Sequence, residues 1–198
     1  HEESLRRSFA IAHRVERNRS TGLGDVTALA AGGVERRTSP GSPFTGDLLT
    51  KGPGVSEGWF EKIEVLLAWK EDSGKHTSSY IDDPNWKESI SKAGAKQMNS
   101  LIQGEWDKSQ WRKLIESSEI FAHESGLLLD SSRSELLEES RDIIHTLDLE
   151  YTPLLCMLGK SLVIVPKNVE DGRFPDNLQQ RLKEVGFKTQ KTMLRSLF

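Results

Sequence analysis

The sequence has a single cysteine, Cys156, so no internal disulfide can form. Its neighbours Leu154, Leu155, Met157 and Leu158 predict a buried thiol within an apolar strand. No run approaches the roughly 18 apolar residues of a membrane helix, and the N-terminal residues lack the apolar block of a secretory signal. These absences favour an intracellular protein, cytoplasmic or nuclear, with no membrane partner.

Motifs for metals and nucleotides are also missing. The 5 histidines are dispersed, without the paired spacing of a metal site. There is no Gly-Lys-Ser/Thr sequence, and the Gly-x-Gly within residues 21–33 follows a predicted helix rather than a strand. We therefore expect residues 21–33 to be a linker, with no metal ligand and no cofactor.

Catalytic patterns are equally weak. His123, Glu124 and Ser125 are adjacent, whereas a catalytic triad converges in space, so turn or capping roles are expected. Asp148 and Glu150 precede an apolar strand, but the lysine-bearing partner motif of a metal-dependent nuclease does not follow. The sequence thus predicts no catalytic residue.

The net charge of −3 argues against a dedicated nucleic-acid binder. Charge is nevertheless polarised, because residues 130–150 are mainly acidic and residues 181–198 mainly basic. The basic residues that could contact nucleic acid are Arg181, Lys183, Lys188, Lys191 and Arg195.

What is present suggests one domain with an extension. The 198 residues suffice for a single core, but only 35% are apolar and 29% are charged, so part of the chain is expected outside that core. The chain begins at His1 without an initiator methionine, which leaves a longer parent chain open.

Residues 4–17 predict a short amphipathic helix. Leu5, Phe9, Ala12 and Val15 recur at spacings of three and four, with arginines largely at the other positions. We expect these four side chains to bind a partner protein, or a second copy of the chain.

Residues 20–58 are rich in glycine and predict a mobile arm with little regular structure. The exceptions expected are a helical turn at 26–31 and an anchor formed by Phe44, Leu48 and Leu49. Basic pairs before hydroxyl residues and two Ser-Pro sequences are typical of kinase sites. The phosphorylation sites suggested are Ser8, Ser39 and Ser42.

The region that follows is rich in tryptophan and predicts helices at residues 56–69, 83–103 and 107–116. Its five tryptophans lie at helical spacing beside leucine and isoleucine, which favours core packing over partner binding. They are Trp59, Trp69, Trp86, Trp106 and Trp111.

The C-terminal part predicts a small ββαβ unit. Two short runs, 119–122 and 126–129, are read as strands, and a helix begins at Ser131 or Ser132. Next come a hairpin, a helix capped by Asp176 and a third strand. The ranges of the hairpin strands are 154–158 and 161–165, and the third strand covers 187–193.

The fold expected is therefore α+β: a helix at 1–19, a flexible arm at 20–57 and an α+β domain at 58–198. The function favoured is a noncatalytic regulatory or assembly subunit whose N-terminal helix and arm dock on a partner. The alternatives are a nucleic-acid-binding protein using the basic C-terminal residues, and an enzyme whose site forms only in the fold.

Overall fold

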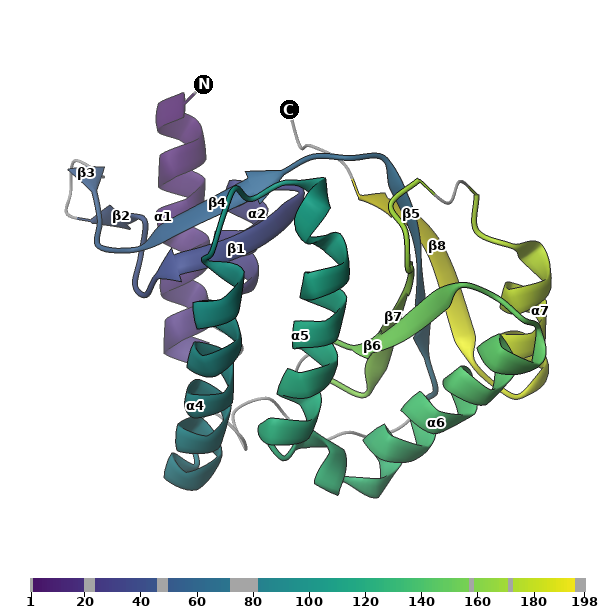
Figure 1. Ribbon diagram of the computed structural model, residues 1–198. Coiled ribbons are helices and arrows are strands. Elements are labelled where there is room, and N and C mark those ends of the chain that lie inside the picture. The colour runs from purple at the N-terminus through teal and green to yellow at the C-terminus, as the bar shows by residue number, and fades with distance from the viewer. Residues whose placement is uncertain are drawn as a thin grey trace.

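The computed structural model describes residues 2–19, 24–45, 50–71, 82–156, 159–170 and 173–194, and it confirms an α+β fold (Figure 1). The N-terminal elements are α1 (Glu2–Arg19), α2 (Asp25–Ala31), β1 (Val34–Ser39), β2 (Phe44–Thr45), β3 (Thr50–Lys51), β4 (Val55–Trp59) and β5 (Ile63–Trp69). After them come α4 (Pro84–Leu101), η1 (Lys108–Gln110), α5 (Trp111–Glu124), η2 (Leu127–Leu129), α6 (Ser131–Thr146), β6 (Tyr151–Leu155), β7 (Ser161–Pro166), α7 (Asp176–Glu184) and β8 (Lys188–Leu194). No helix within these ranges is long and apolar enough to cross a membrane.

Four antiparallel strands form the main sheet, in the order β6-β7-β5-β8. Strand β5 is central, because Leu66 lies opposite Ile164 of β7 on one side and Lys191 of β8 on the other. With helices between β5 and β6 and between β7 and β8, the chain follows the β-α-β-β-α-β order of ferredoxin-like folds. The ββαβ unit is confirmed, and β5 is inserted between its second and third strands.

Helices α6 and α7 cover one face of this sheet (Figure 1). Successive side chains of a strand point to opposite faces, and this face carries Leu66 and Ala68 of β5 with Leu162 and Ile164 of β7, all fully buried. The helices contribute Leu136, Leu137, Ile144, Leu178 and Leu182. Burying each leucine or isoleucine stabilises the fold by about 1.5–3 kcal/mol.

The other face packs against α5 and the β1–β4 hairpin. Three of the predicted core tryptophans, Trp59, Trp106 and Trp111, are buried there, and the rings of Trp59 and Trp111 meet edge to face. The indole N–H of Trp111 donates to Pro166 O at 2.7 Å, and that of Trp106 donates to Val34 O at 2.8 Å. The predicted core role is confirmed for these three, while Trp69 and Trp86 are partly buried.

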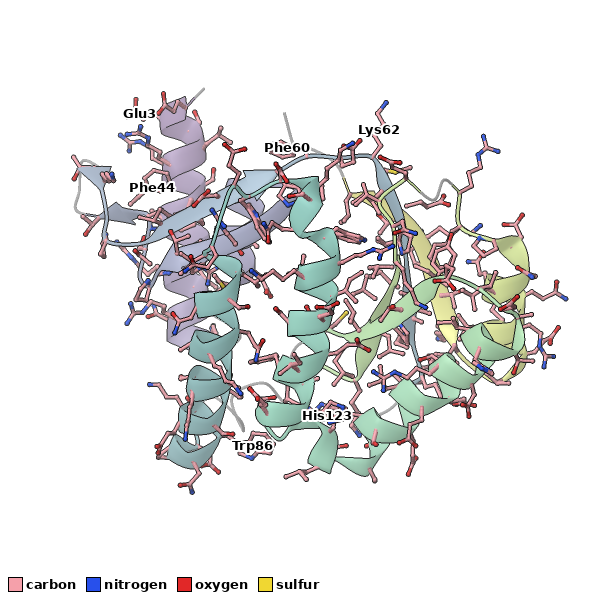
Figure 2. The ribbon with its side chains drawn as sticks, viewed as in Figure 1. Glu3, Phe44, Phe60, Lys62, Trp86 and His123 are labelled. Carbon is pink, nitrogen blue, oxygen red and sulfur yellow. The ribbon has the colours of Figure 1, made fainter. Side chains whose placement is uncertain are left out.

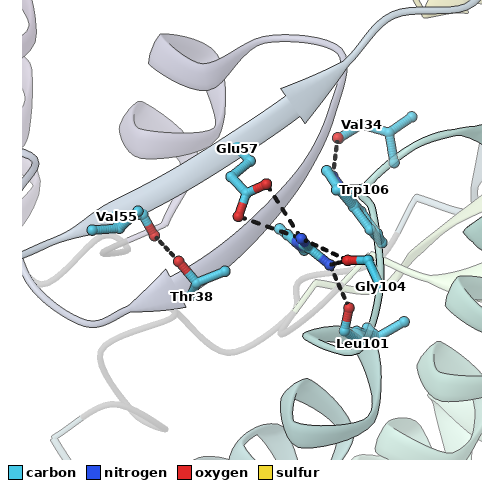
Figure 3. Close-up of polar contacts among 8 residues, drawn as sticks. Val34, Thr38, Val55, Glu57, Leu101, Gly104 and Trp106 are labelled. Carbon is cyan, nitrogen blue, oxygen red and sulfur yellow. Dashed lines mark hydrogen bonds and ion pairs between the residues drawn. The ribbon is translucent and has the colours of Figure 1, made fainter.

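Arg36 fastens the β1–β4 hairpin to the end of α4 (Figure 3). Its buried guanidinium donates to Leu101 O at 2.7 Å and to Gly104 O at 3.2 Å, and it pairs with Glu57 at 3.3 Å. It also lies 5.2 Å from the ring centroid of Trp106. These bonds satisfy carbonyl groups that the end of a helix leaves without intrahelical partners.

The arm expected at residues 20–57 forms more regular structure than its glycine content predicted. It contains α2, at the predicted helical turn, and the strands β1 to β4. Glycine serves close backbone approach here: a Cβ on Gly58 would lie 2.1 Å from Gly32 O. Phe44 meets the ring of Phe9 edge to face at 5.3 Å, as an anchor would (Figure 2). Leu48 and Leu49 lie outside the described residues.

Two other element predictions are wrong. Residues 56–69 form strands β4 and β5 rather than a helix, because a central strand buried on both faces is a nearly continuous apolar run that lacks clear alternation. Residues 119–122 and 126–129 belong to α5 and η2 rather than to strands. The helical spacing of Trp111, Ile115 and Ala122 keeps one side of α5 buried through that region.

The remaining helices and strands follow the predictions with small shifts. Asp83 caps α4, accepting from Asn85 N at 2.9 Å, and Pro84 is its first residue. Helix α6 is capped by Asp130 rather than by a serine. Helix α7 begins at Asp176 and is preceded by Pro175, which provides no side-chain cap.

Candidate functional site

A cluster of charged side chains lies where α1, α2 and β1 meet. We define the charge cluster as His13 and Glu16 of α1, Asp25 of α2 and Arg37 of β1, since Glu16 interacts electrostatically with the other three. Arg37 ties the elements together by donating to Gly24 O at 3.0 Å, one residue before α2 begins. Three separate segments thus bring two carboxyl groups, an imidazole and a guanidinium together.

Glu16 is the carboxyl group of the charge cluster whose pKa is shifted. Its pKa is raised above the ordinary value, first by burial and then by the nearby negative charge of Asp25. A bond from the Val26 backbone N–H and the charges of His13 and Arg37 oppose this shift. Its Oε2 is buried, with no hydrogen-bond partner among the described residues. Such perturbed carboxyl groups are frequent where protons are transferred.

Glu35 adds a further carboxyl group beside Arg37. Burial raises the pKa of Glu35, and the charge of Arg37 partly offsets this increase. The two side chains approach to 3.2 Å. The positive charge of Arg37 is therefore shared between Glu35 and the carboxyl groups of the charge cluster.

A hollow of about 240 Å³ lies at the start of α6 and is a second candidate site. We call it the Lys70–Lys160 hollow, after the two lysines in its lining. Glu71, Glu135 and Glu139 line it as well, and Lys70 pairs with Glu139. Because acidic side chains balance the lysines, the hollow is a weaker candidate for binding a phosphate than its lysines alone would indicate.

Asp130 and Arg133 lie at the start of α6, on either side of Ser132 in the lining of this hollow. Arg133 is almost fully buried and reaches both Asp130 Oδ2 at 3.3 Å and Gly159 O at 3.4 Å. Hydrogen bonding from Ser132 and the positive charges of Arg133 and Lys160 lower the pKa of Asp130 despite its partial burial. These contacts hold the β6–β7 turn against the first turn of α6.

The four side chains predicted to bind a partner are divided by the structure. Phe9 is buried, stacking on His13 at 5.5 Å, and Ala12 is half-buried. Leu5 and Val15 are 38% and 54% exposed. Partner binding at these residues stays a prediction, with Phe9 under the surface rather than on it.

The three serines suggested for phosphorylation have different environments. Ser8 is exposed on α1, and Ser39 is half-buried at the end of β1. Ser42 donates to Phe44 O at 2.6 Å, so its hydroxyl is engaged in the turn before β2. Only Ser8 has the open hydroxyl that a modifying enzyme needs.

The basic C-terminal residues do not form one surface. Arg181 and Lys183 lie on α7, where Arg181 pairs with Glu184. Lys188 and Lys191 sit three positions apart on β8, hence on opposite faces, and pair with Glu71 and Asp176. Arg195 lies outside the described residues.

Other candidates from the sequence remain structural. Cys156 is half-buried rather than fully buried, and desolvation raises the pKa of its thiol. Glu124 is held by Lys96 and Ser125 is buried, so these neighbours of His123 do not assemble a triad. Among the residues that the structure describes, no group of three or more His, Cys, Asp or Glu side chains could hold a metal ion.

Sequence reasoning missed the charge cluster. The available signal was the Gly-x-Gly-Asp sequence: Asp25 opens α2, which meets half of the strand-turn-helix condition for a phosphate loop. The element before it is α1 rather than a strand, and residues 20–23 lie outside the described ranges.

Two comparisons with known proteins bear on this geometry. The chain is 28% identical over 165 residues to a pantoate kinase of Thermococcus kodakarensis, covering 83% of this chain and 48% of that protein. It also superposes with a TM-score of 0.67 and 25% identity on a solved phosphotransferase related to the CoA biosynthesis pathway, covering 96% of this chain and 55% of that one. No family model matches the sequence. The chain spans about half the length of both proteins.

Both matches are to phosphotransferases. They contradict the noncatalytic regulatory or assembly subunit and its nucleic-acid-binding alternative, and with them the expectation that an enzyme is the less favoured interpretation. The charge cluster has no sequence motif that would indicate it, because its residues meet through the packing of α1, α2 and β1.

Proposed function

We propose that this chain is part of a phosphotransferase that transfers a phosphoryl group from a nucleoside triphosphate to a hydroxyl group of pantoate or a close analogue. The observation that carries the proposal is the 165-residue match to a pantoate kinase. The structural match to a phosphotransferase supports it independently, since it extends over 96% of the chain.

The charge cluster provides the proton acceptor for this reaction. The substrate hydroxyl oxygen forms a bond to the γ-phosphorus while the bond from that phosphorus to the β–γ bridging oxygen breaks. The hydroxyl proton passes to Asp25, and the nucleoside diphosphate leaves with the bridging oxygen. Glu16, whose pKa is raised by burial and by Asp25, places a second carboxyl group beside the acceptor.

Kinases position their phosphates with cations, and the charge cluster has one permanent cation, Arg37. A nucleotide-bound Mg²⁺ is held by one or two carboxylates together with phosphate oxygens, and Glu16, which does not take the proton in this scheme, would be a donor of that type. Such an ion neutralises phosphate charge when bound. We infer that further phosphate-binding groups come from the half of the fold that the matched proteins have beyond this chain.

The test is a pantoate-dependent assay on the product of the intact gene, following nucleoside diphosphate release and phosphopantoate by mass spectrometry. We expect Asp25→Asn to lower kcat/KM by about a hundredfold or more, because general base catalysis contributes on that order. Asp142→Asn, an exposed carboxylate on α6, is the matched control and should remain within about twofold.

Absence of pantoate phosphorylation by the wild-type protein at millimolar substrate would refute the proposed reaction. Full activity of Asp25→Asn would refute the proposed role of the charge cluster. A metabolic kinase of this kind acts inside the cell, so the intracellular location predicted from the sequence stays part of the proposal.

A further inference from the structure

An apolar groove runs between α1 and α2. It encloses about 380 Å³, and its apolar lining includes Leu5, Phe9, Ala12, Val26, Leu29 and Phe44. Within this lining Leu29 is 60% exposed and Leu5 is 38% exposed. Contiguous apolar surface of this kind in a soluble domain marks a binding face.

Ring contacts hold the residue at the base of the groove in place. Phe9 is only 6% exposed, and its ring is held between His13 and Phe44, the latter visible beside α1 in Figure 2. Arg6 lies over the Phe44 ring at 5.5 Å and also pairs with Glu2. An apolar centre bordered by ion-paired polar residues is the usual anatomy of a protein interface.

The lengths of the matched proteins identify what covers this groove. The solved phosphotransferase matches 96% of this chain but is matched over only 55% of its own length, and the pantoate kinase over 48%. Each therefore has nearly as much protein again outside the shared fold. Two halves of that size within one enzyme bury roughly 600–1,500 Å² against each other, and apolar side chains form the centre of that contact.

We infer that the α1–α2 groove seats the second half of the phosphotransferase fold, which rests on the proposed function. The charge cluster lies on the same two helices as the groove, with Glu16 on α1 and Asp25 on α2. Seating the second half here places those carboxylates at the junction of the halves, where ligand sites concentrate.

The test co-expresses this chain, carrying an affinity tag, with the half of the T. kodakarensis pantoate kinase that it does not match. Leu29→Asp places a charge in the groove at an exposed position, and Leu129→Asp, at a residue 88% exposed on η2, is the matched control. We expect wild type and Leu129→Asp to retain the second half near one to one, and Leu29→Asp to retain at least about tenfold less. Leu29→Ser, which introduces no charge, and the thermal midpoints of the tagged chains test whether a loss of retention comes from misfolding.

Three results would overturn the inference: no retention by wild type, equal retention by the two aspartate variants, or a dimer of this chain alone that Leu29→Asp dissociates in light scattering. The last would assign the groove to a second copy. Retention without pantoate phosphorylation supports the groove and counts against the proposed function. Phosphorylation of pantoate by this chain as a monomer supports the proposed function and counts against the groove as the contact with the second half.

Discussion

On the α6–α7 side of the sheet, apolar side chains such as Leu66, Leu162 and Leu182 are sealed from solvent. On the α1–α2 side, Leu29 and Ile11 are largely exposed. Buried side-chain polar atoms without a hydrogen-bond partner are, within the described ranges, all between residues 16 and 59. Natural proteins rarely leave such groups unpaired without a functional reason.

The difference separates the part of the molecule that stabilises the fold from the part to which we assign the reaction. The α6–α7 side holds the fold through close packing. The α1–α2 side keeps carboxyl groups and exposed apolar surface, which we propose are completed by a substrate and by a second protein segment. Substitutions on the first side should act on stability, and those on the second side should act on activity or assembly. The following variants test that division.

The largest effect on stability is expected from Leu182→Ala. Leu182 of α7 is fully buried against the sheet, so its truncation leaves a cavity and should lower the free energy of unfolding by about 2–5 kcal/mol. Leu29→Ala on α2 should change it by less than about 0.5 kcal/mol. Urea unfolding followed by tryptophan fluorescence measures both, and equal losses would remove the contrast between the two sides.

A somewhat smaller effect is expected from Arg36→Leu, at the contact between the hairpin and α4. Removing the guanidinium leaves Leu101 O and Gly104 O without this donor and should cost about 3 kcal/mol. Glu57→Gln removes the half-exposed partner and should cost under about 1 kcal/mol. If both variants unfolded at the same urea concentration, the ion pair rather than the carbonyl contacts would fasten the hairpin.

Much of the helical structure could be predicted from the sequence. Asp83-Pro84 marks the start of α4, and the apolar pattern after Ser131 marks α6, because capping and helical periodicity are local signals. Strand β5 could not be recognised, since its six apolar residues over seven positions resemble a buried helix as much as a central strand. Its position follows from pairing with β7 and β8, which are far away in the sequence.

The charge cluster was harder to predict for a related reason. Glu16, Asp25 and Arg37 share no motif, and glycine around them suggested mobility. In the fold these glycines allow backbones to cross closely, as Gly58 does beside Gly32. A site assembled by such crossings leaves little periodic signal, whereas its electrostatics are clear once the segments are placed.

An intermediate effect, which depends on pH, is expected from Asp130→Asn at the start of α6. Bonding from Ser132 and the charge of Arg133 lower the pKa of Asp130, so the ionised form stabilises the native state above its ordinary value of 3.8. That contribution is lost as the pH falls below 3.8. Asparagine still caps the helix, so the variant should be less stable by about 1 kcal/mol at pH 7 and approach wild type near pH 2.

The smallest effect on stability, and of opposite sign, is expected from Glu16→Gln. Burial and Asp25 raise the pKa of Glu16 above 4.5, so its contribution to stability is full below 4.5 and is lost as the pH rises through the native value. At pH 7 the ionised form therefore destabilises the fold, and glutamine removes this destabilisation.

The thermal midpoint of Glu16→Gln at pH 7 should accordingly equal or slightly exceed that of wild type, with the difference vanishing below about pH 4. Pantoate phosphorylation by the intact protein should nevertheless fall, because the charge beside Asp25 is gone. Lower stability at pH 7 together with unchanged activity would assign Glu16 to the fold and abolish the distinction between the two sides. Higher stability with lower activity would show that this side retains a destabilising group for its chemistry.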